Sequence, residues 1–149
     1  MRTDSSDPNS TPLPERFISG VTIDPSDPSG NTMYVVFNGF SAQYVEGFGA
    51  GLGHVWKTTD GGLTFANISG NPKVAADALP DVPASDLVVG ANGALYLGTD
   101  LGVFVSTKVG SWSRLGTTLP TTISNDLVLH RGKLYVGTYG RGIWSSRVG

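Results

Sequence analysis

Four carboxylate residues lie in segments that separate the predicted strands, where catalytic side chains are often found. They are Glu46, Asp77, Asp81 and Asp100. Hydrolysis of a glycosidic bond needs two carboxylates on one face, about 5–5.5 Å apart in a retaining enzyme and about 6.5–9.5 Å apart in an inverting one. None of the four lies in a recognisable catalytic motif, so hydrolysis is only one of two open classes of function.

The same segments contain aromatic side chains and a cation, including Phe48. Rings beside carboxylates suit stacking on sugars with hydrogen bonds to hydroxyls, and they suit an ordinary protein interface equally well. We therefore expect a polysaccharide or protein ligand to contact residues 38–53, 71–83, 99–102 or 138–142. The candidate ligand-binding residues are Tyr44, Glu46, Asp100, Tyr139 and Arg141.

Other chemistries find little support in the sequence. His54 and His130 are the two histidines, and neither has a partner at a metal-ligand spacing. Asp24 and Asp27 lie in "DPSDPSGN", which lacks the alternating oxygen ligands of a calcium loop and favours a proline turn. There are no cysteines, and no phosphate-binding glycine loop precedes a helical pattern. The sequence therefore predicts no metal and no cofactor.

Composition narrows the class of protein further. Charged residues make up 15% of the 149 residues, below the usual ~25%, and 21 residues are glycine. The net charge is −2 with no basic run, which argues against nucleic-acid partners. No apolar run reaches the ~18 residues of a membrane span, and the first residues are polar, unlike a signal peptide. Many glycines among Thr, Ser and Val indicate short strands joined by tight turns.

The candidate residues depend on predicted strands that form a β-meander, with no sustained helical period. Residues 1–15, with three prolines and three serines, are interpreted as a flexible linker or tail. The predicted strands are 18–23, 32–37, 54–58 and 64–69, then 84–89, 94–98, 103–106 and 112–115, then 124–129, 133–137 and 143–145.

An internal repeat supports this order. "LYLGTDLGVFVSTKVG" (95–110) aligns without a gap on "LYVGTYGRGIWSSRVG" (134–149), which places Tyr96 on Tyr135, 39 residues apart. Four-stranded propeller blades repeat at roughly 40–45 residues. Tyr34 takes the same place in a first unit with longer loops. The sequence thus predicts an all-β fold, a β-propeller segment of about two and three-quarter four-stranded blades, at 16–70, 83–119 and 120–149, the last incomplete.

The stretch "KTTDGGLTF" predicts a structural turn. An Asp in a hairpin turn accepts hydrogen bonds from backbone N–H groups further on, and Gly supplies the positive φ that the turn needs. The five residues Thr58, Asp60, Gly62, Thr64 and Phe65 resemble the Asp-box, Ser/Thr-x-Asp-x-Gly-x-Thr-Trp/Phe, of BNR-repeat β-propellers. The ungapped alignment places Ser106 and Ser145 on Thr58, and Lys108 and Arg147 on Asp60. A turn tolerates such replacements, whereas a catalytic carboxylate would not.

The segments "PERFISGVTIDPSDPSGNTMYVVFNGF", "LYLGTDLGVFVS" and "LYVGTYGRGIW" extend the resemblance to the last blades of bacterial Asp-box propellers. These include proteins related to family 74 xyloglucanases and sortilin-type Vps10 domains. The resemblance implies a secreted or cell-surface protein whose loops 38–53 and 71–83 form the binding face. We expect a non-catalytic segment that acts as a scaffold or binds carbohydrate or protein; the alternative is part of a glycoside hydrolase.

The third unit lacks a fourth strand, so we expect an open edge at 143–145 and an open face on the first unit. Residues 1–15 would be poor donors of the missing strand, because their prolines remove ladder hydrogen bonds. The remaining blades of a propeller, or self-association, would cover these surfaces.

Overall fold

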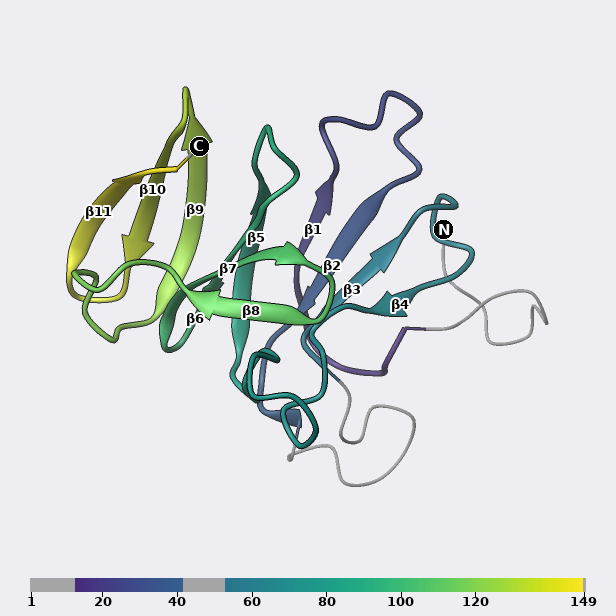
Figure 1. Cartoon of the computed structure of the whole chain (residues 1–149), viewed down its shortest axis with the longest axis horizontal. Coiled ribbons are helices and arrows are strands. Elements are labelled where there is room, and N and C mark those ends of the chain that lie inside the picture. The colour runs from purple at the N-terminus through teal and green to yellow at the C-terminus, as the bar shows by residue number, and fades with distance from the viewer. Residues whose placement is uncertain (1–12, 42–52, 149) are drawn as a thin grey trace.

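The protein has an all-β fold, as the sequence predicts (Figure 1). The computed structural model describes residues 13–41 and 53–148, and within them eleven strands form three antiparallel sheets. The strands are β1 (Ile18–Ile23), β2 (Met33–Phe37), β3 (Val55–Thr58), β4 (Ala66–Asn67), β5 (Ala84–Val89), β6 (Leu95–Thr99), β7 (Gly102–Lys108), β8 (Ser111–Arg114), β9 (Ser124–His130), β10 (Lys133–Thr138) and β11 (Gly142–Arg147).

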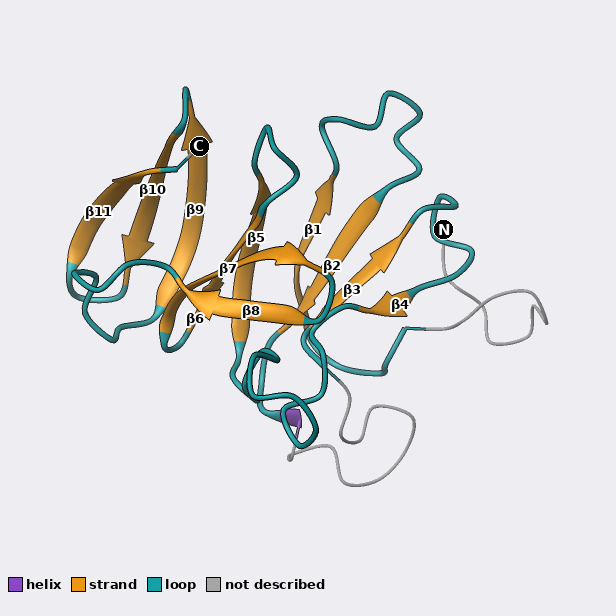
Figure 2. Cartoon of the chain, in the orientation of Figure 1, coloured by secondary structure: helices purple, strands orange, loops and turns teal. Residues whose placement is uncertain are grey.

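Each sheet is a meander whose strands follow in chain order (Figure 2). The first sheet contains β1 to β4, the second β5 to β8 and the third β9 to β11. The three sheets follow one another across the molecule (Figure 1). All eleven predicted strands are present, with bounds that differ by a few residues at most. Within the described residues, β11 is an edge strand of the third sheet, next to β10.

The first and second sheets enclose a hydrophobic core cluster that includes Tyr34 and Val36 on one side and Leu87 and Phe104 on the other. Hydroxyl groups of β1 fasten the sheets directly to one another. Ser19 Oγ donates to the carbonyl of Ala84 (2.7 Å), and Thr22 Oγ1 donates to the carbonyl of Leu87 (2.6 Å). Each bond gives a part-buried hydroxyl group of one sheet a partner on the backbone of the other, as polar groups removed from water require.

The second and third sheets meet at a second cluster, in which Tyr96 and Val103 contact the sheet that carries Leu127 and Val136. The carboxylate of Asp86 accepts a hydrogen bond from the Leu127 N–H across this interface (2.8 Å). Burial raises the pKa of Asp86, against the hydrogen bonds that stabilise its charged form. The three sheets therefore share two separate interfaces of the same type.

The turn between β3 and β4 has the hydrogen bonds expected of a structural Asp turn. Asp60 Oδ1 accepts from the N–H groups of Leu63 (3.0 Å) and Thr64 (2.9 Å), and Oδ2 accepts from Thr64 Oγ1 (2.6 Å). Thr58 Oγ1 donates to Asp60 Oδ1 (2.7 Å) and accepts from the N–H of Gly62 (3.0 Å). Gly62 has a φ of 95°, a conformation that disfavours any side chain. The Asp60 carboxylate thus organises the whole turn.

The ungapped alignment of the second and third units is wrong after Thr138. Thr99 pairs with Gly102, whereas Thr138 pairs with Gly142, so the third unit has one extra residue in this turn. Every later equivalence shifts by one. Ser146, not Ser145, lies opposite Leu134, as Ser106 lies opposite Leu95 and Thr58 opposite Met33. The replacement for Asp60 in the third unit is then Val148, not Arg147.

Packed structure begins before the predicted start of the first unit. Leu13 packs against a third cluster, formed by Val35, Phe37, Trp56 and Phe65 on the outward face of the first sheet. The Arg16 guanidinium lies over the Phe37 ring, 5.5 Å from its centroid. Segment 13–16 therefore covers the outer half of this face.

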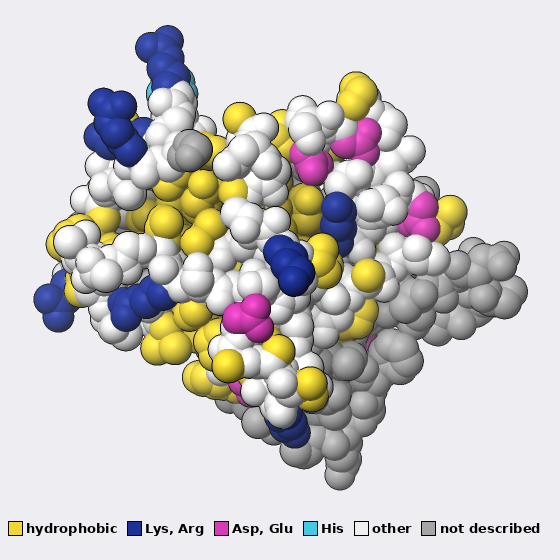
Figure 3. Space-filling model, in the orientation of Figure 1, with side chains coloured by type: hydrophobic (Ala, Val, Ile, Leu, Met, Phe, Trp, Pro, Cys, Tyr) yellow, Lys and Arg dark blue, Asp and Glu magenta, His cyan; other side chains and the backbone are white. Residues whose placement is uncertain are grey.

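Charge is unevenly distributed along the molecule. Figure 3 shows Lys and Arg side chains gathered over the third sheet, at the left, and Asp and Glu side chains over the first sheet, at the upper right.

In the described ranges, no helix is long and apolar enough to cross a membrane.

Candidate functional site

The two long connections end on the same side of the sheets. Residues 38–54 join β2 to β3, and residues 68–83 join β4 to β5. The described ends of the first connection, 38–41 and 53–54, lie with the second connection on the lower side of Figure 1, as do the β6–β7 and β10–β11 turns, which contain Asp100 and Tyr139. The Ser41 N–H donates to Asp81 Oδ1 (2.7 Å), which ties one connection to the other. The turn organised by Asp60 lies away from this side.

A pocket of about 410 Å³ lies between the two connections. Ligand pockets commonly enclose about 300–1,000 Å³, so this one is large enough for a small ligand. Its polar lining residues include Ser41, His54, Asn67, Asn71, Lys73 and Asp81. Leu79, Pro72 and Pro80 supply apolar surface beside them.

His54 is a buried polar residue that lines this pocket. It precedes β3, and its Nε2 lies 2.7 Å from Asp81 Oδ1 while its Nδ1 lies 3.1 Å from Arg16 Nη2. Arginine can only donate and a carboxylate only accepts, so a neutral imidazole with its proton on Nε2 satisfies both neighbours. His54 therefore links the chain before β1 to the connection before β5.

Arg16 supports the same arrangement from the other side. Its Nη1 donates to the Gly53 carbonyl (3.0 Å) and to Ser41 Oγ (3.3 Å), and its Nη2 also donates to the Gly39 carbonyl (3.2 Å). The planar fork of a guanidinium suits several acceptors held at fixed positions. Three chain segments that are distant in sequence thus meet at His54 and Arg16.

The electrostatics keep this cluster in one protonation state. Burial lowers the pKa of His54 most strongly, and the positive charge of Arg16 adds to the effect, against the hydrogen bonds to Asp81 and Phe37. Partial burial raises the pKa of Asp81, but hydrogen bonds from Ser41 and His54 outweigh it and hold that pKa below its ordinary value. At neutral pH the pair is therefore a neutral imidazole donating to a carboxylate.

Ser41, His54 and Asp81 do not form a hydrolytic triad. In a triad the aspartate holds one imidazole nitrogen and the serine contacts the other. Here Asp81 Oδ1 and Ser41 Oγ both approach Nε2, at 2.7 and 3.4 Å, and Arg16 occupies Nδ1. The arrangement supports binding and positioning rather than activation of a nucleophile.

The rim of the pocket presents hydrogen-bonding groups toward solvent. Asn67 Oδ1 accepts from the Ser69 N–H (2.9 Å), and Asn71 Oδ1 accepts from the Lys73 N–H (3.0 Å). Among the described residues, the amide nitrogens of Asn67 and Asn71 and the ammonium of Lys73 have no hydrogen-bond partner in the protein. These donors are available to a ligand with hydroxyl or carbonyl acceptors.

The predicted ligand-binding residues are only partly described. Tyr44, Glu46 and Phe48 lie outside the described residues. Asp100 and Tyr139 occupy turns on the predicted side, where their N–H groups donate to Pro83 and Ile123 carbonyls. Asp100, Tyr139 and Arg141 do not line the pocket, whereas Asp81, noted as a carboxylate from the sequence, does.

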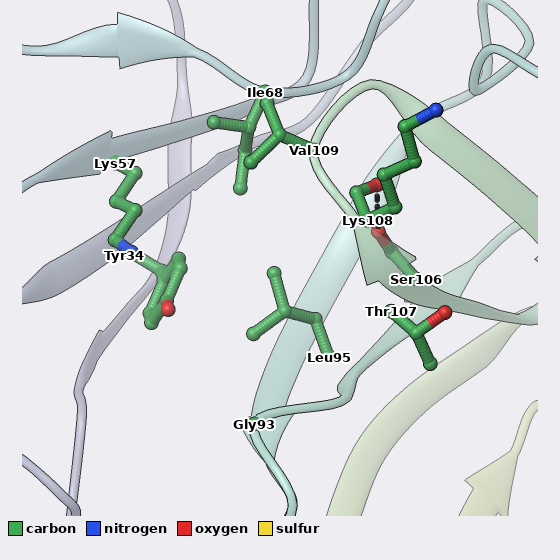
Figure 4. Close-up of a pocket in the computed structure, with 9 residues that line it drawn as sticks. All are labelled: Tyr34, Lys57, Ile68, Gly93, Leu95, Ser106, Thr107, Lys108 and Val109. Atoms are coloured by element: carbon green, nitrogen blue, oxygen red, sulfur yellow. Dashed lines mark hydrogen bonds between the residues drawn. The ribbon is translucent and has the colours of Figure 1, made fainter.

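A second, smaller cavity separates the first and second sheets near the Lys108 turn (Figure 4). It encloses about 100 Å³, and Tyr34 and Leu95 extend into it from facing sheets. Lys57 Nζ lies 5.5 Å from the centroid of the Tyr34 ring. Burial and the nearby Asp24 carboxylate raise the pKa of Tyr34 to about 12. Its size and neutral phenol indicate a packing gap rather than a ligand site.

Sequence reasoning missed the roles of Arg16, Ser41 and His54. The sequence shows only that His54 has no partner at a metal-ligand spacing, whereas the structure shows it buried and hydrogen-bonded to Arg16 and Asp81. Its partners lie 38 and 27 residues away, a separation that no local motif reveals. Within the part of the chain that the structure describes, no group of three or more His, Cys, Asp or Glu residues is placed to hold a metal ion.

No protein-family model matches this chain, and no curated protein matches it significantly.

Proposed function

We propose that this chain is a segment of an Asp-box β-propeller from a secreted or cell-surface protein, and that it binds carbohydrate without cleaving it. The observation that carries the binding proposal is the pocket of about 410 Å³ between the two long connections. Its base is fixed by His54, Asp81 and Arg16, and its rim presents donors to solvent.

The architecture supports the propeller part of the proposal. Three meander sheets pack face to face in chain order, and the equivalent tyrosines Tyr34, Tyr96 and Tyr135 recur on successive sheets. The turn organised by Asp60 is placed between the third and fourth strands of its sheet, as in the resembling families. Radial repetition of such sheets is how propellers protect their strand edges.

The chemistry of the pocket supports a polyhydroxylated ligand. Amide nitrogens and an ammonium group donate, the Asp81 carboxylate accepts, and Leu79 with the two prolines offers apolar surface for the C–H groups of a sugar ring. A pre-formed base lowers the entropic cost of binding, because fewer side chains have to be ordered. This set of groups needs no bound metal.

A glycan array followed by calorimetry tests the proposal. We expect binding to one class of polysaccharide fragment, at least tenfold weaker for Asn71→Ala combined with Lys73→Ala. Lys108→Ala, on the opposite side of the sheets, is the matched control and should bind as the unchanged protein does. Loss of binding in Lys108→Ala with retention in the double variant would overturn the assignment of the site, and absence of any glycan binding would overturn the ligand class.

One observation favours the alternative, part of a glycoside hydrolase. Partial burial raises the pKa of Asp100, which is the direction needed for a general acid. A hydrolase would release reducing ends from β-glucans, and Asp100→Asn would abolish that release. Carbohydrate binding with no release of reducing ends, in the unchanged protein and in Asp100→Asn alike, would exclude the hydrolase for this chain.

A further inference from the structure

The outward faces of the first and third sheets carry apolar side chains at the same positions as the faces that pack together inside the molecule. The pairing registers establish which residues are equivalent. The second strand of each sheet carries a tyrosine at the same place in its pairing with the first strand. These equivalent residues are Tyr34, Tyr96 and Tyr135. Tyr34 belongs to the core between the first and second sheets, and Tyr96 to the core between the second and third. Each of these two tyrosines thus packs against the next sheet in the chain.

Tyr135 faces outward, where the described residues supply no next sheet. Its side chain is 37% exposed, against 5% for Tyr96. The difference in exposed fraction is larger on the next strand, at Ile143. The equivalent Val103 is fully buried against the third sheet, whereas Ile143 is 80% exposed. A large β-branched side chain therefore remains in water at a position where its equivalent belongs to a core.

The first sheet shows the complementary feature on its opposite face. Leu87 and Val89 of β5 pack against the preceding sheet, and Val21 and Ile23 occupy the equivalent positions of β1. Val21 is 59% exposed, whereas Leu87 is 1% exposed. Segment 13–16 packs on this face at Phe37, and among the described residues Val21 and Ile23 of β1 stay exposed.

Two glycines show how closely a neighbouring sheet would approach. A Cβ at Gly98 would lie 2.5 Å from the Ser124 carbonyl oxygen of the third sheet, so this position must lack a side chain. Gly137 is the equivalent residue of the third sheet, and a Cβ there would meet only Asp126 of its own sheet, at 3.5 Å. The third sheet therefore has room at Gly137 for a neighbouring sheet to approach as closely as the third sheet approaches Gly98.

The charges near the two faces are opposite. The third sheet carries His130, Lys133 and Arg147 around Tyr135, and the Lys133 ammonium lies 5.2 Å from the centroid of that ring. The turn that follows β1 carries Asp27, which is partly exposed, and hydrogen bonds from Ser29 and Thr32 lower the pKa of its carboxyl group. The β1–β2 and β9–β10 turns lie at the same end of their sheets (Figure 1), so a neighbour in the same orientation would bring these basic groups toward the Asp27 carboxylate.

We propose that the outward face of the third sheet, with Val128, Tyr135 and Ile143, packs head to tail on the open face of the first sheet, with Val21 and Ile23, of a second copy of this chain. The contact would reproduce the two interfaces already present within one chain. It is heterologous, because two different faces meet, and a heterologous contact closes into a ring when the rotation permits.

The size of the ring rests on the propeller architecture proposed above, whereas the contact itself does not. Each copy supplies three sheets, and propellers have about four to eight blades. Two copies would supply six sheets and bury both open faces of each copy. We therefore expect a dimer whose two contacts are identical.

Sedimentation velocity over a concentration series, with paired variants, tests the proposal. The unchanged protein should sediment at twice the mass of the chain at roughly 100 μM, where contacts of micromolar Kd are largely formed. Val21→Glu and Ile143→Lys should each be monomeric, because each removes one of the two faces. An equimolar mixture of these variants should form a 1:1 dimer, since each variant retains the face that the other lacks. Val74→Glu, at an exposed valine outside both faces, is the control and should behave as the unchanged protein.

Several outcomes would overturn the proposal. These are a monomeric unchanged protein at roughly 100 μM, a dimer that survives either substitution, or a mixture that stays monomeric while both variants remain folded by circular dichroism. A dimer that survives both substitutions forms elsewhere, for example along the open side of β11. If either variant misfolds, Ile23→Glu and Val128→Lys address the same faces. None of these measurements involves a glycan, so failure here leaves the pocket assignment standing, and the reverse also holds.

Discussion

At the scale of single residues, Asp60 and His54 show how polar side chains stabilise the fold over different separations in the sequence. The Asp60 carboxylate is hydrogen-bonded within one turn, by residues that lie two to four positions away in the sequence. His54 joins segments far apart in the sequence. The first arrangement follows from local chain geometry and can be predicted, whereas the second requires the complete fold.

Asp60→Ala should lower the melting temperature without affecting glycan binding. Hydrogen bonds from Thr64 and Thr58 hold the pKa of Asp60 well below its ordinary 3.8. A depressed folded-state pKa means that the stabilisation is complete above about pH 4 and is lost as the pH falls toward the folded-state pKa. The difference in melting temperature between the variant and the unchanged protein should therefore shrink below pH 4. Calorimetry at pH 7 and pH 3, with Asp77→Ala as control, measures this; an equal difference at both pH values would contradict it.

His54 should make the protein less stable in mild acid. Burial holds its folded-state pKa below 6.5, so the unfolded chain binds the proton more readily and stability falls as the pH drops through 6.5 toward the folded-state value. His54→Gln should flatten the dependence of the unfolding free energy on pH between 7 and 5. His130→Gln, at an exposed histidine that ends β9, is the matched control. Urea titrations at several pH values would show the difference, and an equal slope for all three proteins would refute the prediction.

At the scale of the elements, close approach of sheets explains where small residues are required. Gly98→Ala should destabilise the protein by about 1–3 kcal/mol, because the added methyl group would lie 2.5 Å from a backbone oxygen of the next sheet. Gly137→Ala is the matched variant, with ordinary contacts only, and should leave the stability of the dilute monomer nearly unchanged. Urea unfolding of both measures the contrast, and equal losses of stability would count against it.

The strands of all three sheets were predictable from the sequence because their turns have strong local signals. "DPSDPSGN", "TDGG" and "GANG" interrupt runs of β-branched residues, and each break falls between two observed strands. The register of β11 was not predictable from an ungapped alignment. One extra residue in the turn after Thr138 reverses which face each later side chain occupies, because successive side chains of a strand alternate.

The sequence predicts the loops that would contact a ligand, and this stays a prediction. The pocket that the structure shows is lined by residues at the described ends of the first connection and by residues of the second. His54 and Arg16 carry no signal in their own segments. Their function follows from burial and from partners tens of residues away, which only the packed structure defines.

At the scale of the whole molecule, protection is graded from the second sheet toward the third. Every residue of β6 is buried and every residue of β11 is exposed. Amide exchange should therefore be slowest in β6 and fastest in β11, since strands covered on both faces open only with the rest of the core. Raising the protein concentration should slow exchange in β9 to β11 and in β1. Hydrogen–deuterium exchange at two concentrations tests both statements, and uniform exchange across the sheets would contradict the gradient.

The turns after β6 and β10 are closed in the same way although they differ in length. Thr99 Oγ1 donates to the Gly102 carbonyl (2.7 Å), and Thr138 Oγ1 donates to the Gly142 carbonyl (2.6 Å) around one more residue. The threonine–glycine hydrogen bond marks the start of the following strand, and side chains between the two residues, such as Leu101 and Tyr139, are exposed. Both turns lie on the side of the pocket. Sequence variation, or a grafted peptide, can therefore be accommodated there while the strands keep their places. This part of the chain is where new specificity would arise in evolution, and where it would be easiest to install in the laboratory.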